Sequence, residues 1–178
     1  MSELNKSMEA PAPLKGIAVL MRANPRLIAY WTLTLIVAWE NLGGAIWAFL
    51  RIDYSRVTLE HLGYPLFIFN ILGPGELCIA VALLLPGFPV AKEWAYAGTT
   101  IKYAAALTSW LSVGEVGSQA GWAALCLALG VGSWALRPRA ETTPRLGEIS
   151  VRRWVGILAI LVVFAVFTLL TLPAPPHF

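Results

Sequence analysis

Long, continuously apolar segments, separated by short polar or proline-containing connections, dominate the chain. A transmembrane helix needs about 20 consecutive, mostly apolar residues. The runs are continuous rather than alternating, which favours helices over a barrel of strands. The predicted fold class is therefore all-α, a polytopic membrane helix bundle. The pattern predicts five spans: Leu27–Leu50, Pro65–Pro86, Glu93–Val113, Gln119–Leu136 and Trp154–Leu172.

Composition supports this assignment. Of the 178 residues, 58% are hydrophobic and only 13% are charged, whereas a soluble domain carries about 25% charged residues. The lipid bilayer is the partner that such a chain requires. The formal net charge of +3 is interpreted as a topological signal, and we expect no nucleic-acid partner.

Basic residues are distributed unequally between the two ends of the predicted spans. Arg51 and Arg56 are the two on one side, and cytoplasmic segments carry the excess of lysine and arginine. We therefore expect an inner (plasma) membrane protein whose N-terminal segment, 1–26, is cytoplasmic and whose C-terminus lies outside. The ten basic residues on the other side are Lys6, Lys15, Arg22, Arg26, Lys92, Arg137, Arg139, Arg145, Arg152 and Arg153.

Three ionisable residues fall near the middle of predicted spans: Glu40, Glu76 and Lys102. Such groups cost about 2.5 to 3.5 kcal/mol each on insertion scales, so they are rare in membrane helices and usually functional. An unpaired buried ammonium is very unfavourable, which predicts that Lys102 pairs with Glu76. Glu40 would then be available to hold or transfer a proton. These three are the candidate catalytic residues.

Neighbouring polar and aromatic residues complete the candidate site. We expect Trp39, Tyr103 and Trp110 to line a pocket for a flat lipophilic ring, with Asn41 beside the first glutamate. His61, in the connection after the first span, would lie at the mouth of the bundle. A structural alternative stays open, in which Glu40 shares Lys102 or bonds to Asn41 and the histidine is simply a solvated loop residue.

The chain offers little for a metal or a resident redox group. Cys78 and Cys126 lie in different spans without a C-x-x-C motif, so they are expected to be small core residues. The only histidines are His61 and His177, neither at mid-depth, and no clustered ligands suggest haem, zinc or iron–sulfur. We therefore expect no metal and no cofactor within the chain.

The last two spans differ in character. Ala120, Ala124, Ala128 and Gly132 recur every four residues, a small-residue ridge typical of tight helix contacts. The last span has no charge and almost no small residues, so we expect it to be peripheral and to face lipid.

Several motifs together resemble the DoxX-like family of small membrane proteins. The resemblance extends from about Tyr30 to Pro138 and implies a four-helix core, 27–136. The additional transmembrane helix, 154–172, lies outside the resemblance and is expected to follow a cytoplasmic linker, 137–153. The family often has histidine where this chain has Trp110. The motifs are His61-Leu-Gly-Tyr-Pro65, Ile71-Leu-Gly73, Ala82-Leu-Leu-Leu-Pro86-Gly-Phe-Pro89, Lys92-Glu-Trp-Ala-Tyr-Ala-Gly98 and Ser133-Trp-Ala-Leu-Arg-Pro138.

Three functions remain open from the sequence. The resemblance implies a membrane subunit that binds a small lipophilic ligand such as a quinone, with electrons supplied by a soluble or membrane redox partner. The second is a cofactor-free enzyme that applies acid–base chemistry to a lipophilic substrate, of isomerase, epoxide-opening or cyclase type. The third is a small proton-linked transporter.

Overall fold

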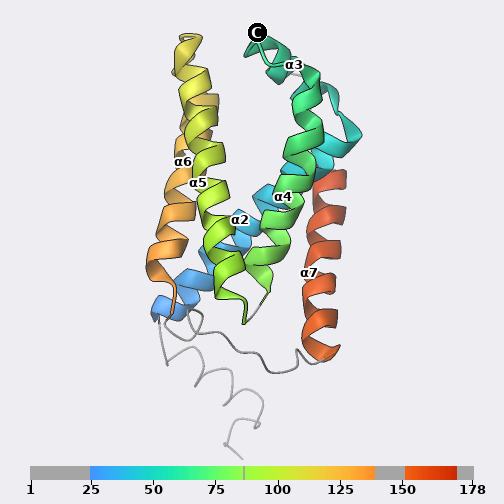
Figure 1. Ribbon diagram of the computed structural model, residues 1–178, viewed down its shortest axis with the longest axis vertical. Helices are drawn as coiled ribbons and strands as arrows, with labels where there is room; N and C mark the ends of the chain where they lie inside the picture. Colours follow the sequence, from blue (N-terminus) through green and yellow to red (C-terminus); the bar gives the residue numbers. More distant parts are fainter. Residues whose placement is uncertain (1–24, 86, 139–150, 172–178) are drawn as a thin grey trace, which may run out of the picture.

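A computed structural model describes residues 25–85, 87–138 and 151–171, and the regular elements in these ranges are all helices (Figure 1). The prediction of an all-α bundle is confirmed. Residues 1–24 and 139–150, which hold most of the predicted N-terminal segment and linker, lie outside the described ranges. The elements are α2 (Pro25–Leu50), α3 (Asp53–His61), the 3₁₀ helix η1 (Leu66–Ile68), α4 (Phe69–Leu84), α5 (Pro89–Ser112), α6 (Ser118–Leu136) and α7 (Val151–Leu170).

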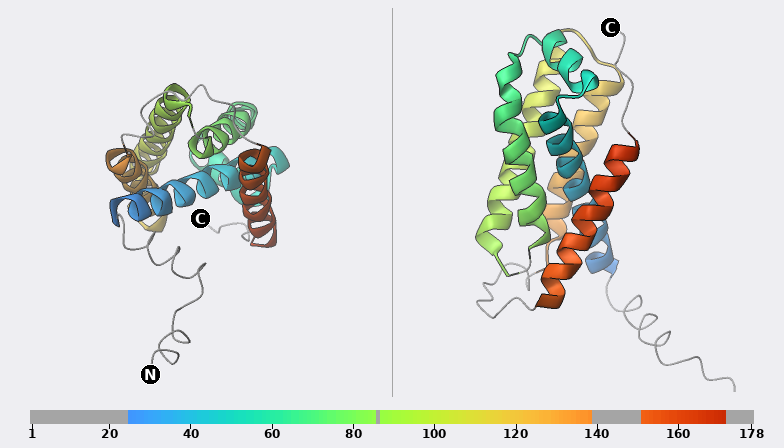
Figure 2. Two further views of the ribbon diagram at one scale, coloured as in Figure 1. Left: turned by 90° about the horizontal axis from the view of Figure 1, so that it is seen from below. Right: turned by 90° about the vertical axis from the view of Figure 1, so that its right-hand side faces the viewer.

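Four long helices form a closed bundle in which each packs against two others. α2 contacts α4 and α6, and α5 contacts the same two helices from the opposite side (Figures 1 and 2). α7 lies outside this ring and packs on α2. The arrangement places the middles of α2, α4 and α5 around one interior.

Three helical segments are long and apolar enough to cross a membrane by themselves: Pro25–Leu50, Leu66–Leu84 and Ser118–Leu136. α5 has the length, 24 residues, but its lysines, Glu93 and hydroxyl residues make it more polar. The described apolar part of α7, Val155–Leu170, is shorter. That α5 and α7 also cross the membrane remains a prediction. For α5, the other helices of the bundle would have to shield its polar residues from lipid.

α3 and η1 cover one end of the bundle. Tyr54 of α3 exchanges hydrogen bonds of 3.0 and 3.2 Å with Gln119 of α6. His61, at the end of α3, lies 3.8 Å from the carboxylate of Glu115. Gly63, with φ of 75°, lets the chain turn back after α3 in a conformation that side chains disfavour. The connection between the first two spans is thus a fixed cap.

Basic side chains gather at the opposite end, and two of them are more deeply buried than expected. Lys92, which the sequence placed in a turn, belongs to α5 and is fully buried, with Nζ 3.4 Å from the Tyr30 hydroxyl and 5.2 Å from the Trp31 ring centroid. Arg137 is also buried and donates to Glu93 at 2.8 Å. These residues therefore help to hold the helices together at this end.

The contact face of α6 differs from the predicted ridge. Ala124 and Ala128 are exposed, whereas Ala123, Cys126 and Gly130 are buried against the bundle. A Cβ on Gly130 would come within 3.2 Å of the Thr99 side chain. The four-residue spacing was right for Ala120, which is buried, and for Gly132, where a Cβ would lie 3.5 Å from the Leu33 side chain. It was wrong for the two alanines between them, because packing on two neighbours (α2 and α5) selects other small residues.

The two cysteines differ in burial. Cys126 is buried, as predicted, but Cys78 is exposed on α4. The expectation that both are core residues was wrong for Cys78, because α4 turns that side away from the other helices.

α7 also departs from its prediction. Several of its residues, such as Val162 and Val163, are exposed on the outer side as expected. On the inner side, however, Ile157 and Thr168 are buried, and Phe167 makes an edge contact with Trp39 at 5.6 Å between ring centroids. The helix is therefore packed on one side rather than merely appended to the core.

A buried hydroxyl cluster ties three helices together. The hydroxyl of Ser133 on α6 lies 2.8 Å from that of Thr34 on α2 and 3.0 Å from that of Tyr96 on α5. Thr34 also donates to the carbonyl of Tyr30 at 2.7 Å. Each hydroxyl thus has a partner inside the bundle, where an unpaired one would be unfavourable.

We predict that Ser133→Ala lowers the free energy of unfolding by about 1 kcal/mol, since the Tyr96 hydroxyl loses its partner. Ser112→Ala is the control, because that hydroxyl is exposed and bonds to a nearby backbone carbonyl. Denaturant unfolding in detergent micelles measures both. Equal effects of the two changes would mean that the cluster adds nothing to stability.

Candidate functional site

Lys102 lies at the centre of the candidate site. Its Nζ is 3.0 Å from Oε1 of Glu76 and 3.0 Å from Oδ1 of Asn41. The side chains of the lysine and the glutamate are only 16% and 10% exposed. α5, α4 and α2 each supply one of these residues, so the contact joins the three helices.

Asn41 is positioned to accept from the lysine. Its side-chain nitrogen donates to the Val37 carbonyl at 2.8 Å, which leaves the amide oxygen facing Lys102. The Tyr103 ring lies on another side of the ammonium, 4.1 Å from Nζ to the centroid, within the range of a cation–π interaction. The ammonium thus meets a carboxylate, an amide oxygen and an aromatic face.

Gly44 makes room for the carboxylate. A Cβ at this position would lie 2.5 Å from Oε2 and 2.7 Å from Oε1 of Glu76, closer than atoms pack. The absence of a side chain on this turn of α2 therefore lets the carboxylate of α4 approach the helix backbone. Gly44, four residues after Glu40 in the sequence, thus makes room for the glutamate of a different helix.

Glu40 stands apart from this pair. In the described parts of the chain no basic side chain comes within ion-pair distance of it. Its carboxylate accepts a hydrogen bond of 3.3 Å from the Trp122 indole of α6. The structure therefore pairs Glu76 with Lys102, whereas Glu40 bonds to a side chain of α6.

Two pockets of about 550 Å³ flank the pair. The first, here called the α4–α5 pocket, has Lys102 and Glu76 in its wall and is otherwise mostly apolar. A smaller pocket of about 230 Å³ has the same two residues and Glu40 in its wall. Since it shares wall residues with both larger pockets, it lies between them.

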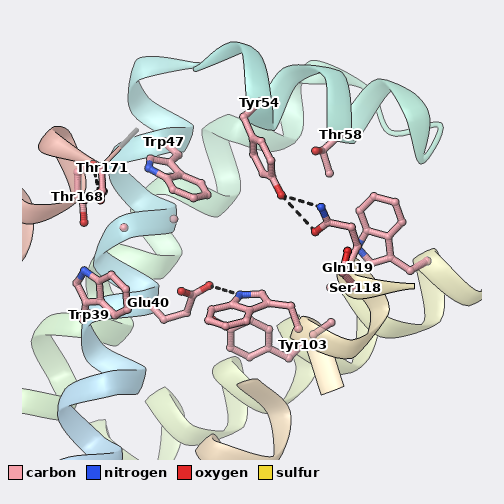
Figure 3. A pocket seen from close by; sticks show the side chains of 16 residues that line it. Trp39, Glu40, Trp47, Tyr54, Thr58, Tyr103, Ser118, Gln119, Thr168 and Thr171 are labelled. Carbon is pink, nitrogen blue, oxygen red and sulfur yellow. Dashed lines mark hydrogen bonds between the residues drawn. The ribbon is translucent and has the colours of Figure 1, made fainter. Parts of the chain in front are cut away.

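The second large pocket, here called the tryptophan pocket, lies under α3 on the side of α6 and α7 (Figure 3). Figure 3 shows the carboxylate of Glu40 between aromatic rings contributed by several helices. Its aromatic wall residues are Trp39 and Trp47 of α2, Tyr54 of α3, Tyr103 and Trp110 of α5, and Trp122 of α6.

The sequence candidates are divided between these pockets. Trp39, Tyr103 and Trp110 do share one pocket, the tryptophan pocket, but Lys102 does not line it. Lys102 lines the α4–α5 pocket instead, and Trp110 lines both pockets. The reason is that the lysine side chain extends toward α4 and its pair with Glu76.

Two other candidates do not line any of the three pockets. Asn41 is fully buried, with both ends of its amide bonded to Lys102 and Val37. His61 lies 5.9 Å from the Trp110 ring, centroid to centroid, behind the pocket wall. Both are placed to orient wall residues, and their predicted role in ligand contact is untested.

Several wall residues were not identified from the sequence. Tyr54, Trp122 and Thr168 line the tryptophan pocket, and the sequence did not single them out. Trp47 and Glu40 do fall on one helical face, at i and i+7. That face was a usable signal, whereas the contributions of α3, α6 and α7 depend on tertiary packing.

The class of protein follows from this geometry: a helical membrane bundle with an interior lysine–glutamate contact and lateral pockets. The DoxX-like family model matches residues 32–136, more than half of the chain. The chain belongs to the DoxX-like family. The matched range covers α2 to α6 and leaves α7 outside. No curated protein and no solved structure matches the chain.

We predict that Lys102→Met alone is strongly destabilising, by about 3 to 5 kcal/mol, because it leaves the Glu76 carboxylate without its cation. Combining it with Glu76→Gln should recover much of that loss. A double-mutant cycle based on denaturant unfolding measures the coupling. Additive effects would contradict an energetic pair.

The control cycle uses the surface pair of Asp53 and Arg56, which has the same 3.0 Å separation but side chains that are 68% and 50% exposed. Asp53→Asn and Arg56→Gln should couple by less than about 1 kcal/mol, since water screens the interaction.

Proposed function

We propose that this DoxX-like membrane protein binds a small lipophilic molecule carrying a carbonyl oxygen, and that the ligand occupies the α4–α5 pocket. A quinone is the ligand class we favour, with a soluble or membrane partner supplying electrons. The observation that carries the proposal is the position of Lys102 in the wall of an otherwise apolar pocket.

The hydrogen bonds of Lys102 support a donor role. An ammonium group has three N–H donors, and in the described residues Nζ donates to two oxygens, one each from Asn41 and Glu76. One donor is left for a ligand oxygen. Since Glu76 offsets the charge, binding a neutral carbonyl does not leave an uncompensated cation in the pocket.

The surroundings favour a ligand that arrives through the bilayer. Ile71 and Ile101 line the pocket and are 65% and 69% exposed, so its rim is apolar where it opens between α4 and α5. Leu72, Ile79 and Ala105 continue the apolar wall inward. Apolar walls with one or a few placed polar groups are typical of small-molecule sites.

The proposed orientation has the N-terminus in the cytoplasm. Arg26, Lys92 and Arg137 lie at the end of the bundle opposite α3: Arg26 donates to the carbonyls of residues 135 and 136, and Arg137 binds Glu93. Arg51 and Arg56 are at the end covered by α3. By the positive-inside rule, the end of the bundle that α3 covers faces outward.

Gly75→Leu tests the ligand site by filling it. A side chain at Gly75 projects into the α4–α5 pocket and meets no atom within 4 Å at its Cβ, and leucine favours a helix over glycine. The fold should therefore be kept while ligand binding falls by about tenfold or more. Fluorescence titration of short-chain ubiquinone into nanodiscs containing the protein measures the loss.

Gly121→Leu is the matched control, because this α6 glycine is equally unobstructed and lies outside the three pockets. It should bind the quinone as the wild type does. Unchanged binding by both variants, or no saturable binding by the wild type, would refute the proposal.

A further inference from the structure

The tryptophan pocket has a polar wall that no part of the proposed function uses. Several buried polar atoms in it lack a hydrogen-bond partner in the described parts of the chain, among them the indole nitrogens of Trp39 and Trp47 and the hydroxyls of Thr58 and Thr168. Thr168 is only 3% exposed. Buried polar groups in native proteins are nearly always satisfied, so this cavity is built for a polar occupant.

The unpartnered atoms point to where the occupant sits. Trp39, Gly43 and Trp47 follow one another at four-residue spacing along one face of α2. A Cβ on Gly43 would lie 3.5 Å from the Thr168 hydroxyl oxygen of α7. In Figure 3 both indole nitrogens lie on the side of α7, whereas the carboxylate of Glu40, between the rings, points the other way, toward Tyr103.

The charge of the wall determines whether a positively or a negatively charged ligand can bind. Among the described residues, Glu40 is the one ionisable carboxylate in the wall, and no described lysine or arginine lines the pocket. Glu76 and Lys102 offset each other at 3.0 Å, so the charge of Glu40 stays unmatched in a weakly polar interior. An anion would be repelled, whereas a cation would supply the missing charge.

The aromatic lining indicates what kind of cation fits. Four tryptophans and two tyrosines surround the space, and ring faces attract quaternary and tertiary ammonium groups, as in aromatic cages. Trp47 and Tyr54 meet edge to face at 5.6 Å between centroids, which forms a corner of such a cage. A bare metal ion needs several oxygen ligands, and in the described residues no cluster of three acidic, histidine or cysteine side chains is found.

We propose that the tryptophan pocket binds an organic ammonium group, with Glu40 as its counter-ion and the aromatic rings as its cage. The hydroxyls and indole N–H groups along α2 and α7 contact oxygen atoms attached to the same molecule. The group belongs either to a free amine such as choline or to the headgroup of a bilayer lipid. The tryptophan pocket shares Thr58, Ala106 and Trp110 with the α4–α5 pocket, but neither Lys102 nor Gly75 lines it. The choline test therefore uses other residues than the quinone test.

The probe is radiolabelled choline, measured by equilibrium dialysis against the whole protein in nanodiscs of phosphatidylglycerol, which lack choline headgroups. We expect saturable binding that excess unlabelled choline displaces and that the neutral isostere 3,3-dimethylbutanol does not. Glu40→Gln should weaken binding by about tenfold or more, because the charge is lost with little change in shape. Absence of saturable binding, or equal displacement by the isostere, would overturn the proposal.

Two variants guard against effects on folding. Glu60→Gln, an exposed residue of α3 outside the three pockets, removes the same charge at the same end and should leave binding unchanged. Trp122→Leu removes one ring of the cage at a half-exposed position and should weaken binding while the thermal midpoint stays close to that of the wild type. If Glu40→Gln and Glu60→Gln act alike, the counter-ion assignment is wrong.

Nanodiscs of phosphatidylcholine distinguish the two sources. A lower apparent affinity for choline in these discs means that the lipid headgroup occupies the pocket. Equal affinity in both kinds of disc means that a free ammonium compound is the ligand.

Discussion

The ammonium of Lys102 is the group around which the interior is arranged. A cation in a weakly polar bundle is tolerated only if nearby groups replace its lost hydration, since the desolvation penalty is several kcal/mol per ion. A carboxylate from α4, an amide oxygen from α2 and a ring from α5 itself do so here. Other local features serve these contacts: the glycine at 44 admits the carboxylate, and the Val37 carbonyl fixes the asparagine. One lysine thus links three helices of the ring.

The two acidic residues of the bundle consequently have different tasks. Glu76 is committed to the lysine, so the pair is neutral as a unit and leaves the α4–α5 pocket mainly apolar. Glu40 bonds to an indole of α6 and faces a wall rich in aromatic rings. These contacts form one ion pair and one carboxylate bonded elsewhere, and all three residues line the small pocket between the two larger ones. The α4–α5 pocket is mainly apolar, whereas the tryptophan pocket carries Glu40 in its wall.

The sequence predicted the fold well because membrane helices leave a strong local signal. Length, apolar content and the rarity of ionisable groups gave the helices and the interior position of Glu76 and Lys102. The sequence did not predict the features that depend on how several helices pack together. The face of α6 that packs, the burial of Lys92 and the exposure of Cys78 depend on which neighbours a helix has. The tryptophan pocket was missed for the same reason, since five helices contribute to its wall.

The position of α7 bears on how far the family explains this chain. The family match ends at residue 136, before α7 begins. The residues around Lys102 and the α4–α5 pocket lie inside the matched range. The tryptophan pocket takes Thr168 from α7 and Thr171 directly after it, and Phe167 of the same helix contacts Trp39. Part of the wall of the tryptophan pocket therefore comes from outside the range that the family describes.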